Sequence, residues 1–269
     1  MKRRLLIGAA IFSAVLQPAA SVAGGTILVP HRATYEMKLG ASNSGSQIVG
    51  IDGRMVLIYE ASCDGWSVQQ LMGYRVRRVE GPEIENAFNF SSWESHDGKA
   101  YSFSLRVHRD RELVEELRGA ADLEAPGGPG KAVFTKPDGQ EMALPEGSIF
   151  PTEHILRLIE SAQAGEGHFT RPVFDGASLD GPFEVSAFIG PETMPEADAN
   201  KARHQLTSRR SWPMRLAYFK VAALEPQPDF EISVRLFDNG VADNLIFDYG
   251  DFAIGSTLQD VEELPAPDC

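Results

Sequence analysis

Alternation of apolar and polar residues is the dominant pattern along this chain. Apolar residues rich in Val, Ile, Tyr and Phe recur at every second position in five stretches. A strand that buries one face shows this period, because successive side chains point to opposite faces of the sheet. The pattern therefore predicts strands at 33–39, 54–61, 66–80, 100–108 and 214–222.

Turn signals separate the alternating runs. Asp97-Gly98 lies between two of them, and Asn239-Gly240 divides the stretch 230–250 in the same way. Such dipeptides favour two-residue hairpin turns, because glycine adopts positive φ without strain. We therefore predict a mainly β fold of many antiparallel strands. The hydrophobic content of 43% supports a large core, but length and composition allow either one domain or two.

One segment departs from the strand pattern and predicts a single central α-helix at about 152–164. Pro151 and Thr152 suit the start of a helix, and Gly165 suits its end. The apolar positions have the spacing of one helical face, and they are Ile155, Leu158, Ile159 and Ala162.

Glu153 and His154 are candidates for metal binding or acid–base chemistry on this helix. The spacing of a zinc-binding HExxH motif is absent, and a carboxylate in the first turn is favoured by the helix dipole in any case. We expect both residues to have structural roles.

The first 23 residues have the features of a cleaved signal peptide. Positions 2–4 are basic, 5–16 are apolar, and Ser21 and Ala23 fit an A-x-A-like cleavage site. The apolar run is too short to span a hydrocarbon core of roughly 30 Å, so we expect no integral membrane segment after cleavage. With no cysteine near the cleavage point, a soluble exported protein is favoured over a lipoprotein.

The charge of the chain is strongly acidic. The net charge is −13, and the leader carries three of the 25 Lys and Arg but none of the 38 Asp and Glu. The mature chain then has 22 basic and 38 acidic residues, a net charge of −16. Such a charge repels phosphate backbones and anionic membrane surfaces, so nucleic-acid binding is disfavoured.

The chain contains two cysteines. Cys63 lies in the strand-like stretch EASCDGWSVQQ, and Cys269 is the last residue. In an oxidising compartment such a pair favours a disulfide over two free thiols. The two positions are 206 apart, the difference between 269 and 63, and the chain-entropy model gives about 5 kcal/mol for so long a loop.

Other candidate motifs do not match known catalytic or metal-binding patterns. The segments 124–134 and 192–204 have the Gly, Pro and charge content of loops, and the first lacks P-loop spacing. No GxSxG elbow is present, although a triad whose members meet only in space stays open. Four aspartates lack calcium-loop spacing, and we expect them on turns and a solvated face: Asp238, Asp243, Asp248 and Asp251.

In their order along the chain, several segments together resemble the EipB family of periplasmic cell-envelope integrity proteins of alphaproteobacteria. The resemblance covers nearly the whole mature chain. The segments are HRATYEMKL, CDGW at 63–66, FNFSSWESHDGKAYSF at 88–103, LPEGSIFPTEHILRLIESAQAGEGHF at 144–169, VFDG at 173–176 and the closing YGDFAIGSTLQDVEELPAPDC.

The resemblance implies one β-rich domain at 24–269, built as a bent, open barrel or β-spiral. It also implies a disulfide between Cys63 and Cys269. In function it implies a non-enzymatic, cofactor-free protein of the periplasm that supports envelope integrity under stress. A periplasmic tetratricopeptide-repeat protein is the kind of partner that it implies.

A periplasmic lipid or lipoprotein carrier is the alternative function, because a curved sheet can enclose an apolar groove. An envelope hydrolase has the least support. The candidate groove residues are Phe88, Phe90, Trp93, Trp66 and Trp212, for which the competing interpretation is ordinary core packing.

Overall fold

The computed structural model describes residues 28–43, 45–194, 204–221 and 227–269. Within these residues, fourteen strands form one antiparallel sheet. The strands are β1 (His31–Ser42), β2 (Ile48–Ala61), β3 (Gly65–Arg78), β4 (Ile84–Ser95), β5 (Ala100–Arg109), β6 (Glu112–Leu123), β7 (Gly130–Lys136), β8 (Asp138–Leu144), β9 (His168–Val173), β10 (Phe183–Ile189), β11 (Ser211–Lys220), β12 (Phe230–Phe237), β13 (Ala242–Asp248) and β14 (Phe252–Glu263).

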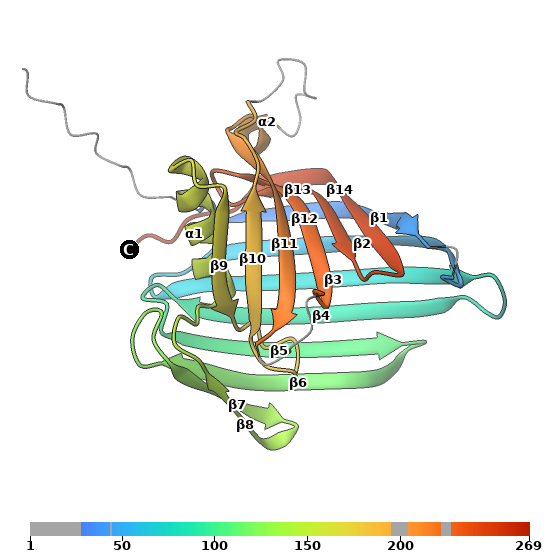
Figure 1. Cartoon of the computed structure of the whole chain (residues 1–269), viewed down its shortest axis with the longest axis horizontal. Helices are drawn as coiled ribbons and strands as arrows, with labels where there is room; N and C mark the ends of the chain where they lie inside the picture. The colour runs from blue at the N-terminus through green and yellow to red at the C-terminus, as the bar shows by residue number, and fades with distance from the viewer. Residues whose placement is uncertain (1–27, 44, 195–203, 222–226) are drawn as a thin grey trace, which may run out of the picture.

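The sheet consists of two meanders, β1–β8 and β9–β14, joined where β1 pairs with β14. The first and last strands therefore pair in the middle of the sheet, and β8 and β9 form its two edges. The helix α1 (Pro151–Gln163) connects these edge strands. In Figure 1, β9–β12 cross in front of β2–β6, so the bent sheet folds over on itself as two layers. This open, strongly bent antiparallel sheet confirms the predicted fold class.

The hydrophobic core falls into three clusters of buried side chains. The first packs Leu158 and Ile159 of α1 against Trp212 of β11 and Tyr59 of β2, so it fills the space between the layers. The second lies along β1, β2 and β12–β14. The third gathers aromatic rings of β5 and β7 around Phe150, the residue before α1. The two edges of the sheet are thus held together through α1 and its flanks.

Both predicted hairpin turns are confirmed, with φ of 65° at Gly98 and 87° at Gly240. The predicted loop at 124–134 is wrong in its second half, because β7 begins at Gly130. This glycine lies so close to β6 that a Cβ would come within 2.2 Å of a β6 carbonyl oxygen. Glycine here therefore permits close strand approach, which its frequent occurrence in loops concealed.

The central helix is confirmed, beginning one residue earlier than predicted. A second, four-residue helix, α2 (His204–Thr207), was not expected. Most of the predicted loop at 192–204 and all of the predicted signal peptide lie outside the described residues. None of the described helices is long and apolar enough to cross a membrane.

Candidate functional site

A disulfide bond ties the C-terminal tail to the body of the protein. The structure pairs Cys63 with Cys269, with an S–S distance of 2.02 Å and a Cα–Cα distance of 5.8 Å. The tail that follows β14 makes one backbone hydrogen bond to the sheet region, from the Leu264 N–H to the Pro30 carbonyl at 2.8 Å. The disulfide is therefore the covalent fastening of the last residues.

Cys63 lies in the tight turn between β2 and β3, not in a strand as its sequence context suggested. The Ser62 N–H donates to the Gly65 carbonyl at 2.8 Å, and the His96 N–H donates to the Asp64 carbonyl at 3.0 Å. These bonds fix the turn against the neighbouring β4–β5 hairpin. Chain ends are poorly ordered unless something fastens them. The disulfide thus fastens the chain end to the hydrogen-bonded β2–β3 turn.

The start of α1 is held by a carboxylate from a distant strand. Phe150 precedes the helix and offers no side-chain cap. Instead the Glu94 carboxylate of β4 accepts hydrogen bonds from the N–H groups of Thr152 at 2.7 Å and Glu153 at 2.8 Å. These are two of the backbone donors that a helix leaves unsatisfied at its start. Sequence reasoning missed Glu94, because it lies 58 positions before Thr152 and no local motif marks it.

Burial sets the ionisation of this anchor. Burial raises the pKa of Glu94 to about 7, although the hydrogen bonds from Thr152 and Glu153 oppose the shift. On the same helix, burial lowers the pKa of His154 to about 4. The His154 ring lies 6.0 Å from the Phe169 ring, and its Nε2 atom has no hydrogen-bond partner among the described residues.

The candidate acid–base pair on α1 is therefore divided. His154 faces the core, whereas Glu153 accepts a hydrogen bond from Arg157 at 2.7 Å on the exposed side of the helix. In the part of the chain that the structure describes, no three His, Cys, Asp or Glu residues are placed to hold a metal ion.

Three of the four C-terminal aspartates make separate side-chain contacts, and Asp251 is exposed in the turn between β13 and β14. Asp238 pairs with Arg209 at 2.5 Å, and Asp248 accepts from the Gly250 N–H at 2.9 Å. Asp243 is buried, so the expectation of a solvated position is wrong for this residue. Its carboxylate is satisfied by Arg235 at 2.5 Å and by the Asn244 N–H at 2.6 Å. A paired carboxylate of this kind is compatible with burial, which alternation alone does not reveal.

The five aromatic residues proposed to line a groove lie in different parts of the fold. Trp212 and Trp66 belong to or pack against the first core cluster, and Phe90 packs against the third. Trp93 points to the opposite face of β4 from Phe88 and Phe90, because strand side chains alternate. These residues do not surround one cavity, and the lipid-carrier hypothesis stays a prediction.

A large hollow lies between α1 and the edge strand β9, and we call it the α1–β9 hollow. Its volume is about 1100 Å³, and its lining comes from α1 and the turn after it, β9, β10, the loop before α1 and the β6–β7 loop. The free edge of β9 carries backbone groups of His168 and Thr170, since alternate residues direct theirs toward β10. Among the described residues, a parallel bridge between Ile149 and Val173 covers one end of this edge.

The α1–β9 hollow is acidic. Five glutamates and two arginines line it, namely Glu146, Glu153, Glu160, Glu166, Glu184, Arg157 and Arg171. Arg157 bonds to Glu153 at 2.7 Å and to Glu160 at 2.9 Å, so two carboxylates share one cation. The other three glutamates are exposed and form no ion pair within the described residues. An unpaired strand edge beside free carboxylates is suited to binding an extended or helical segment with basic side chains.

Comparison with known proteins agrees with this architecture. A model of the EipB-like family matches residues 22–265. The cell envelope integrity protein EipB of Brucella abortus (strain 2308) is 33% identical over 257 residues, which cover 93% of this chain and 90% of that protein. A crystal structure of a beta-barrel-like protein from Brucella abortus shares 30% identity with a TM-score of 0.83, covering 90% of this chain and 100% of that one. The chain therefore belongs to the EipB-like family, as the order of its sequence segments predicted.

Proposed function

We propose that this protein works in the periplasm, where it supports the integrity of the cell envelope by binding a periplasmic tetratricopeptide-repeat protein. The name of the Brucella relative supports the envelope role. The disulfide supports an oxidising compartment, because such bonds persist mainly outside the reducing cytosol. The protein acts in this proposal as a binding scaffold rather than as an enzyme.

The observation that carries the proposal is the α1–β9 hollow. It combines an exposed helix face, an unpaired strand edge and three unpaired carboxylates in one concavity of about 1100 Å³. Tetratricopeptide repeats stack helix pairs into a superhelix with an extended binding surface. A basic surface of that kind complements the acidic rim, and charge complementarity mainly sets the rate and specificity of association.

Reversing the free charges tests the proposal. We expect the triple variant Glu146→Lys, Glu166→Lys and Glu184→Lys to weaken binding of the repeat protein at least tenfold, because like charges then face each other across the interface. All three side chains are exposed, so the fold should hold. The measurement is titration of the purified partner, identified by crosslinking in periplasm, against the variant.

A matched control separates a local effect from a change in net charge. Glu60, Glu80 and Glu115 are exposed, form no ion pair within the described residues and lie outside the hollow. Their replacement by Lys changes the net charge by the same amount, and affinity should stay within twofold of the unaltered protein. Equal loss in both triples, or in neither, would reject the α1–β9 hollow as the docking site.

A further inference from the structure

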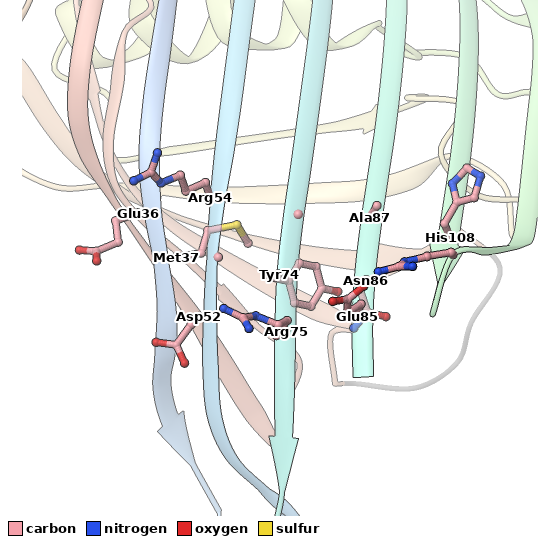
Figure 2. A pocket seen from close by; sticks show the side chains of 13 residues that line it. Glu36, Met37, Asp52, Arg54, Tyr74, Arg75, Glu85, Asn86, Ala87 and His108 are labelled. Atoms are coloured by element: carbon pink, nitrogen blue, oxygen red, sulfur yellow. Dashed lines mark ion pairs between the residues drawn. The ribbon is translucent and has the colours of Figure 1, made fainter. Parts of the chain in front are cut away.

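A second hollow lies on the outer face of the first meander, away from α1, and we call it the outer hollow. It has a volume of about 590 Å³ and is lined by residues of β1–β5 and of the turn after β5. Figure 2 shows these side chains, with Arg54 on one side of Ala87 and His108 on the other. Its lining shares no residue with that of the α1–β9 hollow.

The outer hollow exists because small residues occupy the middle of one row across the sheet. Strand register places Arg54 of β2 beside Gly73 of β3, Gly73 beside Ala87 of β4, and Ala87 beside His108 of β5. Neighbouring strands are about 4.8 Å apart, so the two outer positions of the row are roughly 14 Å apart at the backbone. The side chains of Arg54 and His108 therefore lie on opposite sides of a floor formed by Gly73, which has no side chain, and the methyl group of Ala87.

The floor at Gly73 is open space. A Cβ added there would meet no atom within 4 Å, and the backbone is not in the left-handed region. Nothing in the packing thus requires glycine at this position. By contrast, a Cβ on neighbouring Gly53 would come within 2.4 Å of the Tyr74 Cβ, so Gly53 has a packing role.

The charges around the outer hollow are unequally satisfied. Each of the three lining carboxylates has a basic partner: Glu36 with Lys38 at 2.9 Å, Asp52 with Arg77 at 2.7 Å, and Glu85 with Arg111 at 3.7 Å. Arg54 and His108 take part in no ion pair or side-chain hydrogen bond within the described part of the chain. Among the described basic side chains of the lining, the two without partners are thus the two that flank the open floor.

We propose that the outer hollow binds a phosphomonoester, with the phosphate held between Arg54 and His108 above Gly73. The guanidinium group offers paired N–H donors that match phosphate oxygens, and an imidazole supplies at least one N–H from the opposite wall. A tetrahedral phosphate presents acceptors in several directions and reaches both walls, whereas the two oxygens of a carboxylate lie in one plane. The remaining volume accommodates a polar body such as a sugar, and the Asp52 carboxylate, on the same face of β2 as Arg54, is available to its hydroxyl groups.

The experiment uses two probes, because a soluble phosphosugar and a lipid headgroup can present the same phosphate. Glucose 1-phosphate is titrated calorimetrically into the mature chain, and cosedimentation is measured with phosphatidylcholine vesicles that contain or lack phosphatidic acid. We expect Gly73→Val to abolish binding by filling the floor and Arg54→Gln to weaken it at least tenfold. Gln69→Val, on the same face of β3, and Arg118→Gln, an exposed arginine of β6 without an ion pair among the described residues, are matched controls that should bind within twofold of the unaltered protein.

The outcomes separate the ligand sources and can overturn the proposal. Binding to the sugar phosphate alone identifies a soluble ligand, and Arg54-dependent binding to the phosphatidic-acid vesicles alone identifies a headgroup. Absence of binding to both probes, or binding that Arg54→Gln and Gly73→Val leave unchanged, rejects the site. If Gly73→Val lowers the melting temperature, its loss of binding no longer tests the site. The test then rests on whether inorganic phosphate competes with the probe and whether Arg54→Gln weakens binding. Loss of partner binding at the α1–β9 hollow would leave this result unaffected, since the two linings are separate.

Discussion

Replacing Cys63 or Cys269 with Ser should lower the free energy of unfolding by about 2 to 5 kcal/mol, and the melting temperature by about 5 to 15 °C. The bond joins residues 206 positions apart, so its loss greatly enlarges the conformational freedom of the unfolded chain. In the folded state, loss of the bond also frees the tail after Leu264, whose N–H donates to the Pro30 carbonyl. Thermal and urea unfolding under non-reducing conditions measure the change.

Three comparisons isolate the bond from the substituted side chains. The double variant should be no less stable than either single variant, because all three lack the same bond. Reduction of the unaltered protein should bring it to the stability of the variants. Limited proteolysis of the variants should cut first within residues 264–268, the tail that the disulfide fastens in the unaltered protein. A variant that melts within one degree of the unaltered protein would contradict a stabilising role.

The second large effect is a pH dependence that Glu94 introduces. Its pKa is about 7 in the folded protein and 4.5 as the model value for an unfolded chain. A raised pKa favours the folded state below pH 4.5, and that contribution is lost as the pH rises toward 7. At 1.36 kcal/mol for each pH unit, the loss is about 3 kcal/mol. We therefore expect Glu94→Gln, which does not titrate, to lose about 3 kcal/mol less stability than the unaltered protein between pH 4.5 and 7.5.

The difference in stability between Glu94→Gln and the unaltered protein excludes the contributions of other titrating groups. The lowered pKa of His154 acts in the opposite direction, because stability is lost as the pH falls from 6.5 toward 4. This contribution is common to both proteins and cancels in the difference. Glu160→Gln, an exposed change on the same helix, is the control and should keep the pH dependence of the unaltered protein. Parallel stability curves for Glu94→Gln and the unaltered protein would show that Glu94 does not set this dependence.

The period-two pattern found those strands whose buried faces are regular. In β1, alternate residues from His31 to Met37 are buried, and the register with β2 is unbroken over eight pairs. The pattern failed at β6, where Leu113 and Val114 are adjacent and both about half exposed, and glutamates stand on either side of this pair. Strand formation there depends on pairing with β5 and β7, which is tertiary information.

The candidate site was less accessible from sequence than the fold. The central helix could be found from its apolar face, but its start depends on Glu94, which is distant in the chain. The acidic α1–β9 hollow gathers glutamates from three separate segments around an edge strand, and the row Arg54–Gly73–Ala87–His108 requires the register of four strands. A single sequence carries a signal only for local patterns. Both hollows are formed by residues distant in the chain, so they could be identified only in the folded structure.

The most direct test of the binding role is the detergent survival of a strain that lacks this protein, complemented with one of three forms. The unaltered protein and the Glu60, Glu80 and Glu115 triple variant should restore survival. The Glu146, Glu166 and Glu184 triple variant should accumulate to the same level in the periplasm but leave the strain as sensitive as the deletion. Full restoration by this last variant would contradict the claim that the protein supports the envelope through a partner bound at the α1–β9 hollow.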